Sequence, residues 1–192
     1  RVILLEDVDG KFDGYSCWAN DEIPVVASRC SPELPGDRQR FSLAHELGHL
    51  LLERIDVGDI EREKACHRFA AAFLVPQSAV LSEVGERRGG LSYVELLSLK
   101  HKWGLSMSAW IRRMSDLGGI SQGQYRSAMK KFRTEGWHKR EPGEQVEPER
   151  TQRFERLVQR AVAEDLISVA RAADFLSKPL IEVRREMGWP AA

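Results

Sequence analysis

The sequence has few cysteines, no long hydrophobic segment and no net charge. Its three cysteines, Cys17, Cys30 and Cys66, form an odd number without paired spacing, which argues against a disulfide framework and a Cys-rich metal site. They are expected to be reduced thiols of a cytoplasmic protein. No apolar run approaches the about 20 residues that a membrane span needs, and no signal peptide is visible. The 29 basic and 29 acidic residues balance, so the whole chain has no bias toward nucleic acid or membranes.

The charges are nevertheless unevenly distributed along the chain. Residues 1–90 carry 11 basic and 16 acidic side chains, residues 91–140 carry 10 and 3, and residues 141–192 carry 8 and 10. The middle of the chain is therefore locally basic. With 192 residues, 42% of them hydrophobic, the chain can bury one good core or two small ones. It starts at Arg1 without a methionine and enters a strand-like run at once, so we expect a trimmed fragment.

A helix predicted from Arg40 to Leu52 carries the pattern His45-Glu46-x-x-His49. Positions four apart lie on one helix face, about 6 Å from each other, so both imidazoles can reach one metal ion. Glu46 projects beside them, where its carboxylate can take a proton from a metal-activated water. Asp37 is a plausible N-cap for this helix. Because the same short pattern also occurs on ordinary surface helices, the residues that follow must decide its meaning.

A catalytic zinc site needs a third protein ligand and leaves the fourth position open for water. Glu63, fourteen residues after His49, opens a second predicted helix that runs to Pro76. His67 and Ala70 share a helix face with Glu63, and the small side chain allows close packing on the first helix. Three acidic residues of the preceding connector are alternative ligands, ranked lower because they lack that helical face: Asp56, Asp59 and Glu61.

Over roughly the first 120 residues, the sequence resembles the ImmA/IrrE family of metallopeptidases. The resemblance rests on Phe41-x-x-Ala44-His45-Glu46-x-Gly48-His49, on Glu63, and on Phe69-Ala70-Ala71-x-Phe73-Leu74-x-Pro76. It implies a zinc-dependent, intracellular, mostly bacterial peptidase that cleaves helix-turn-helix repressors. It also implies that the metal ligands are His45, His49 and Glu63, and that Glu46 is the general base.

The sequence departs from the family pattern at His67, where the family more often has Asn. His67 either orients a metal ligand without binding the metal itself, or is an ordinary helix histidine. It is also a weak candidate for the donor that an oxyanion would need. Two histidines and a glutamate suit zinc best, one ion per chain, although another divalent metal is compatible with them.

The expected fold class is α+β, with a zincin-like peptidase domain followed by an all-α, helix-turn-helix-like C-terminal part. Strands are predicted at Val2–Leu5, Tyr15–Trp18 and Ile23–Ala27, with a hairpin turn between Asp7 and Gly14. Together they predict a small antiparallel sheet beside the metal-bearing helices. An edge of such a sheet can hold an extended peptide substrate.

Four parts are predicted along the chain: the peptidase domain at 1–90, a helix-turn-helix-like region at 91–137, a linker at 138–149 and a helical region at 150–192. In the second part, a helix from Tyr93 to Trp103 is followed by a turn at Gly104 and a further helix through Leu117. Four basic side chains there are candidate nucleic-acid contacts: Lys100, Lys102, Arg112 and Arg113. The alternative is a small helical bundle that supports the peptidase and never touches DNA.

Two functions follow from these patterns. The first is a metallo-endopeptidase that hydrolyses a peptide bond with metal-activated water, with a DNA-binding repressor as its protein substrate. The second is a non-catalytic regulatory or antitoxin-like protein that uses the zincin fold as a scaffold for binding DNA or a partner protein. The retained Glu46 favours the peptidase, because a scaffold has no need for a general base.

Overall fold

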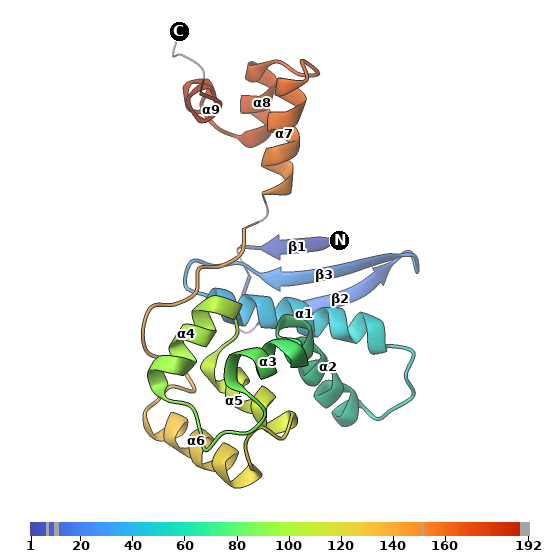
Figure 1. Cartoon of the computed structure of the whole chain (residues 1–192). Coiled ribbons are helices and arrows are strands. Elements are labelled where there is room, and N and C mark those ends of the chain that lie inside the picture. The colour runs from blue at the N-terminus through green and yellow to red at the C-terminus, as the bar shows by residue number, and fades with distance from the viewer. Residues whose placement is uncertain (7, 10–11, 151, 189–192) are drawn as a thin grey trace. The chain divides into compact units, whose positions relative to one another are not determined.

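The computed structural model describes residues 1–6, 8–9, 12–150 and 152–188, and Figure 1 shows the whole chain. The chain divides into two compact units, Arg1–Glu149 and Arg150–Ala192. The predicted division of the first unit at residue 90 stays a prediction. Within the described ranges, no helix is both long and apolar enough to cross a membrane.

The first unit contains a sheet of three short strands, β1 (Val2–Leu5), β2 (Gly14–Ala19) and β3 (Ile23–Arg29), in the order β1-β3-β2. β2 and β3 are antiparallel, but β1 runs parallel to β3. The predicted all-antiparallel sheet is therefore wrong for β1, since β3 rather than β2 is its partner. The α+β fold class is confirmed.

The connection from β1 to β2 is thus not the predicted hairpin turn, because these two strands do not pair. Part of that stretch, residues 7, 10 and 11, lies outside the described residues. Short strand patterns locate strands in the sequence, whereas their partners depend on the path of the connection.

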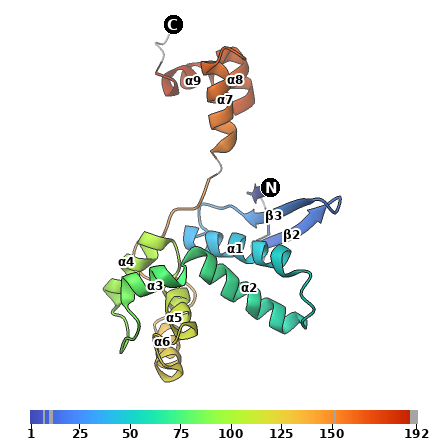
Figure 2. The same ribbon diagram turned by 45° about the vertical axis from the view of Figure 1, so that its right-hand side comes forward.

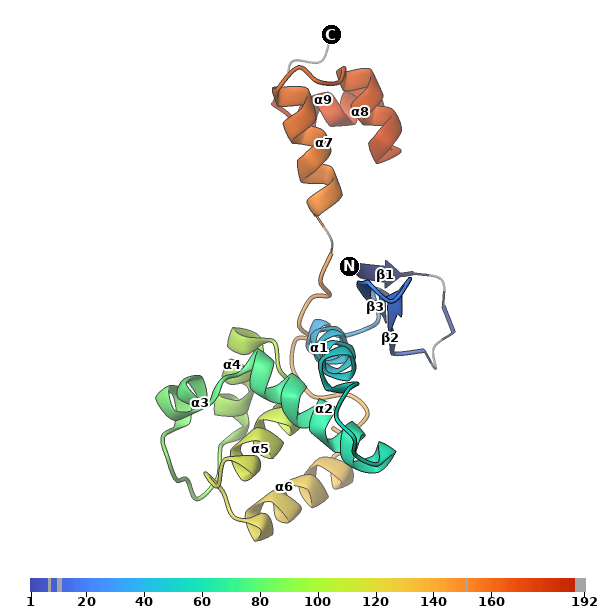
Figure 3. The same cartoon turned by 90° about the vertical axis from the view of Figure 1, so that its right-hand side faces the viewer.

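Helix α1 (Gly36–Leu52) covers the sheet, helix α2 (Asp59–Leu74) packs on α1, and the two helices carry the residues of the sequence motif. α1 lies between the sheet and α2, as Figure 3 shows most directly. Figure 2 shows α2 running alongside α1. α1 begins after Pro35 without a side-chain cap, so the prediction that Asp37 caps it is wrong. Asp37 is instead buried, with its carboxylate turned to a lysine of the next helical layer.

The part of the first unit that the structure describes has four further helices: α3 (Gln77–Val84), α4 (Tyr93–Trp103), α5 (Met107–Asp116) and α6 (Gln122–Thr134). They pack around the fully buried Trp110. Ser92, Ser106 and Ser121 cap α4, α5 and α6 by accepting hydrogen bonds from the backbone. Helix α4, a turn at Gly104 and helix α5 follow each other as predicted, and their assignment as a helix-turn-helix unit stays a prediction.

Residues 141–149, in the segment predicted as a linker, lie against the first unit. The backbone N–H of Gly36 donates to the carbonyl of Val146 at 2.7 Å. The Gln39 side chain accepts from the backbone N–H of Glu149 at 2.6 Å, and Arg40 pairs with the Glu149 carboxylate at 2.6 Å. A Cβ at position 36 would stand only 2.0 Å from the Glu147 carbonyl oxygen, so glycine is required there. This segment therefore holds the beginning of α1.

In its described residues, the second unit has three short helices, α7 (Arg153–Ala163), α8 (Val169–Leu176) and α9 (Leu180–Glu186). Its small core is formed by Val158, Val162, Ala172, Ala173 and Val183. Helix α8 is capped by Ser168, and the turn to α9 places Ser177 in the left-handed region with φ 51°.

Candidate metal centre

The close packing of α1 on α2 brings the candidate ligands together. Gly48 faces α2, where a Cβ would lie 3.1 Å from Phe69 and 3.3 Å from the Cα of Cys66. Cys66 and Ala70 are completely buried at this contact. Small residues on both helices let the backbones approach, and Glu63 of α2 then reaches the histidines of α1.

Three side chains form a compact triangle at the exposed end of this contact, with both carboxylate oxygens of Glu63 facing the histidines. The Nε2 atoms of His45 and His49 are 3.0 Å apart. Glu63 Oε2 lies 3.3 Å from His45 Nε2, and Glu63 Oε1 lies 3.1 Å from His49 Nε2. All three proposed ligands therefore point at one place. Two of them come from α1 and one from α2.

The triangle fits the donor set of a divalent metal ion. A tetrahedral zinc ion with bonds of about 2.0–2.1 Å places its donor atoms about 3.3 Å from one another. The observed separations of 3.0, 3.1 and 3.3 Å are close to that value. Two imidazoles and one carboxylate are also the ligand types that zinc uses in catalytic sites, where a fourth position is left open. A divalent metal thus fits these residues.

His67 lies beside the triangle on α2. Its ring is 4.4 Å from the ring of His45 and stacks on Phe41 at 5.8 Å. One of its ring nitrogens lies within 4.8 Å of ligand atoms of His45 and Glu63, so this exposed histidine belongs to the same cluster. His45 and Glu63 are common to both sets of three, and the distances between ligand atoms are shorter in the set that contains His49. The prediction that His45, His49 and Glu63 are the ligands stays a prediction. The prediction that His67 orients a ligand stays a prediction.

The surroundings of His45 favour its neutral, metal-binding form. Burial lowers the pKa of His45, and so do the neighbouring imidazoles of His67 and His49. The carboxylates of Glu63 and Glu46 raise this pKa, but the net shift is downward. A lowered pKa keeps the ring unprotonated to lower pH. Burial also raises the pKa of the Cys66 thiol in the layer beneath, which favours its protonated form.

Glu46 is held by the sheet. Ser16 Oγ of β2 donates a hydrogen bond of 2.7 Å to Glu46 Oε2. Gly14, at the start of the same strand, leaves room for this side chain, because a Cβ there would lie 2.9 Å from Glu46 Cγ. Sequence reasoning missed both residues. Strand register brings them to a side chain that is 30 residues away from Ser16 in the sequence, and no local pattern indicates this contact.

Among the described residues, the alternative ligands Asp56, Asp59 and Glu61 do not belong to the cluster of His45, Glu63 and His67. Helix α2 begins at Asp59, four residues before the predicted start, so Asp59 and Glu61 lie in its first turn. Glu61 pairs with Lys64 at 2.8 Å. Glu63 is the acidic residue of this region that the structure places between His45 and His49.

Two of the four predicted nucleic-acid contacts are wrong, because their side chains are buried. Lys100 is 1% exposed and pairs with Glu141 at 3.1 Å and with Asp37 at 3.5 Å. Arg113 is 8% exposed and donates to the carbonyl of Val75 at 3.2 Å. Neither can reach a phosphate.

The other two predicted contacts are exposed but paired with acidic side chains. Lys102 pairs with Glu83 at 2.6 Å, and this hydrogen bond lowers the pKa of Glu83. Arg112 pairs with Asp116 at 3.1 Å. A role for Lys102 and Arg112 in nucleic-acid binding stays a prediction.

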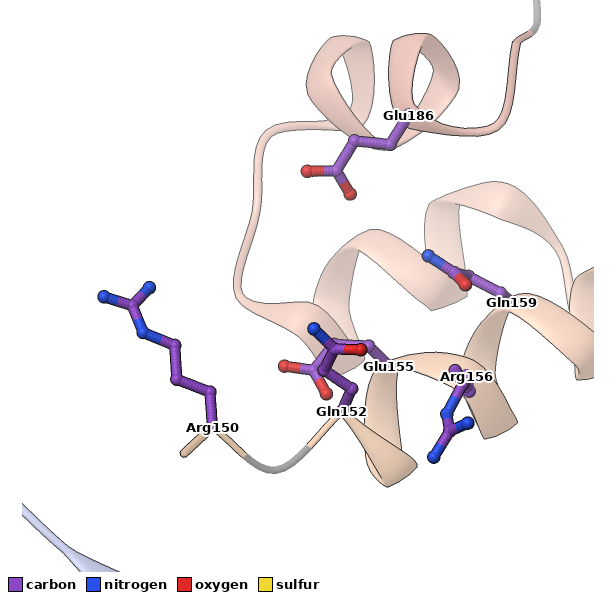
Figure 4. Close-up of a pocket in the computed structure, with 6 residues that line it drawn as sticks. All are labelled: Arg150, Gln152, Glu155, Arg156, Gln159 and Glu186. Atoms are coloured by element: carbon purple, nitrogen blue, oxygen red, sulfur yellow. The ribbon is translucent and has the colours of Figure 1, made fainter. Parts of the chain in front are cut away.

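The second unit contains an open polar hollow of about 450 Å³, shown in Figure 4. Arg150, Gln152, Glu155, Arg156, Gln159 and Glu186 line it. Its side chains carry both charge signs and do not include a histidine or cysteine, so the hollow lacks the donor set found at His45.

The fold and the cluster together define a metallopeptidase-like domain, a mixed α+β unit with a His/Glu cluster between two helices. The sequence profile of the M78 peptidases, described as the IrrE N-terminal-like domain, matches residues 20–115, which is half of the chain. The chain therefore belongs to the ImmA/IrrE family. No individual curated protein matches it significantly. Membership in this family indicates a metallopeptidase-like role.

Proposed function

We propose that the protein is a metal-dependent endopeptidase with His45, His49 and Glu63 as ligands and Glu46 as general base. The observation that carries this proposal is the triangle of the His45, His49 and Glu63 side chains, whose nitrogen and oxygen atoms are 3.0–3.3 Å apart, beside the carboxylate of Glu46, which Ser16 orients separately. A structural metal site would more often use four protein ligands. It would also have no use for a fixed base.

The chemistry divides between the metal and the chain. A bound zinc ion would lower the pKa of water toward neutrality and polarise the scissile carbonyl. Glu46 would accept the proton of the attacking water at its carboxylate and pass it to the leaving amine. Ser16, by holding Oε2, leaves the other carboxylate oxygen of Glu46 for this proton transfer.

The substrate that we propose is a helix-turn-helix transcriptional repressor, cut to release the genes it controls. Family membership supports this choice. The strand that contacts Glu46, β2, is also an edge strand of the sheet, so its free side is available for an extended peptide segment. Pairing with β2 would bring the scissile bond near Glu46.

The metal site is tested by elemental analysis of the wild-type protein and of His49→Ala. We expect about one equivalent of zinc in the wild type and a loss of most of it in the variant, because two remaining donors hold zinc weakly. His101→Ala is the matched control, since this exposed histidine of α4 lies outside the cluster and should leave the metal content unchanged. Absence of metal in the wild type after supply of zinc would refute the proposal.

Ser16→Ala tests how Glu46 is positioned. Removing a hydrogen bond to a carboxylate should lower kcat about 10- to 100-fold with little change in KM, because hydrogen bonds to charged groups contribute about 1.5–3 kcal/mol. Metal content should stay at the wild-type level, and Ser16→Thr, which keeps the hydroxyl, should recover most of the rate. If KM rises while kcat is unchanged, Ser16 contacts the substrate instead of the base.

A further inference from the structure

The basic residues of the middle segment separate into two groups in the structure. Lys100, Lys102, Arg112 and Arg113 are buried or paired with acidic side chains. Six others are exposed and form no side-chain ion pair or hydrogen bond with any described residue: Arg126, Lys130, Lys131, Arg133, Lys139 and Arg140. All six lie on α6 or in the turn that follows it. The excess positive charge of this segment is therefore displayed by α6.

Helix α6 presents these charges from a fixed position. Ser121 accepts from the backbone of Gln124, whose side chain accepts in return, so the helix has a complete capping box. Phe132 is buried in the core, and Tyr125 and Met129 pack against it on the same side. Figures 1 and 3 show α6 at the edge of the first unit farthest from the sheet.

The charges form a stripe along the helix. Arg126, Lys130 and Arg133 follow the spacing i, i+4, i+7, which places them on one face of α6, directed away from Phe132. The stripe is about 10 Å long at a rise of about 1.5 Å per residue. One strand of B-DNA presents a phosphate about every 3.4 Å along its axis, so a stripe of this length spans about three phosphates.

The composition of the surface indicates the kind of partner. Among the described residues between 95 and 152, none is a large hydrophobic side chain exposed to solvent. Protein interfaces usually have an apolar centre, whereas binding to a phosphate backbone needs none. Between 121 and 140 the sequence has one acidic residue, Glu135, against the six cations.

Helix α7 of the second unit provides a contrast. It also has three exposed arginines, Arg153, Arg156 and Arg160, at similar spacing. There Arg160 pairs with Glu164 at 2.7 Å, and Phe154 and Leu157 are 53% and 52% exposed between the arginines. The α7 face is mixed, whereas the α6 face carries only charge of one sign.

From these observations we propose that α6 and the turn after it bind the phosphodiester backbone of a nucleic acid, independently of its sequence. Arg126, Lys130 and Arg133 form the centre of the binding surface, and Lys131, Lys139 and Arg140 extend it. This surface is distinct from the metal centre, so the inference goes beyond the proposed peptidase and does not depend on it.

The test is fluorescence anisotropy with the full chain and a labelled 20-base-pair duplex of random sequence, measured over a series of salt concentrations. We expect binding at 50 mM salt and a linear fall of log K with log salt, as counterion release requires. The triple variant R126Q/K130Q/R133Q should weaken binding about 10- to 100-fold and reduce the salt slope by about three. Because these three side chains are exposed and unpaired, the variant should remain folded, and circular dichroism checks this.

The matched control is R153Q/R156Q/R160Q, which removes the same number of charges from α7. It should retain wild-type affinity and slope. No binding by the wild type, or equal losses in both triple variants, would overturn the proposal. Equal competition by polyglutamate of the same charge would assign the surface to acidic proteins instead. A duplex RNA of the same length tests which nucleic acid the surface binds. Equal affinity for RNA and DNA indicates that the surface accepts either backbone, and weaker binding of RNA indicates that it requires the geometry of DNA.

Discussion

Replacing the general base should abolish cleavage and leave the metal in place. Glu46→Gln keeps the size of the side chain, and its amide oxygen can still accept the hydrogen bond from Ser16 Oγ. It cannot accept a proton at neutral pH, so the rate should fall about 10²- to 10⁴-fold. Glu46 is not part of the triangle of ligand atoms, so about one equivalent of zinc should remain. Single-turnover cleavage of a repressor substrate and elemental analysis measure the two effects.

Glu53→Gln is the matched control for this prediction. Glu53 is an exposed carboxylate at the C-cap of the same helix, and its substitution should change neither rate nor metal content. The scaffold hypothesis predicts a different pattern, in which Glu46→Gln leaves all functions intact. Full cleavage by the Glu46 variant would therefore remove the general-base role. Loss of metal from that variant would instead make Glu46 a ligand.

The largest effect on stability is expected at Lys100. Its ammonium group lies between the buried carboxylates of Asp37 and Glu141. Glu141 also accepts from the backbone N–H groups of Met107 and Ser108, at 3.0 and 2.9 Å, and so caps α5. Lys100→Met leaves two buried acidic groups without their cation, which should lower the free energy of unfolding by about 3–5 kcal/mol. Urea denaturation followed by fluorescence measures this change.

Lys102→Met removes the same charge two positions later and serves as the control. The Lys102 side chain is 59% exposed and pairs with Glu83 at the surface, so its loss should cost less than about 1 kcal/mol. Adding Glu141→Gln to Lys100→Met should recover part of the lost stability, because one uncompensated charge is removed. Similar small effects of both lysine variants would show that the cluster around Lys100 contributes little.

The chemistry of the site was predictable where it depends on local periodicity. His45 and His49 share a helix face because they are four residues apart, and Glu46 projects beside them for the same reason. The prediction of Glu63 required an additional inference about helix packing, because Glu63 lies on another helix. The small residues on its face predicted close packing, which the structure has at Gly48 and Ala70. Local geometry, residue size and the match of Glu63 to the family pattern were enough to predict that these four side chains lie together, and their roles as ligands and base stay predictions.

Contacts between distant segments were not predictable in the same way. Parallel pairing of β1 with β3 and the hydrogen bond from Ser16 to Glu46 both depend on strand order. Lysine and arginine side chains are normally exposed, so the basic sequence of this region predicted that Lys100 and Arg113 lie on a positively charged surface. The burial of Lys100 depends on a partner, Glu141, which is 41 residues further along the chain.

The hydrogen bonds between Glu149 and α1 also have a mechanical consequence. Glu149 is the last residue of the first unit. Its backbone N–H donates a hydrogen bond of 2.6 Å to the Gln39 side chain of α1, and its carboxylate forms an ion pair of 2.6 Å with Arg40 of the same helix. Tension on the chain beyond Glu149 would therefore be borne first by the helix that carries His45 and His49. A partner that pulls on residues 150–192 would therefore exert its force on the first turns of α1, the helix that carries His45 and His49.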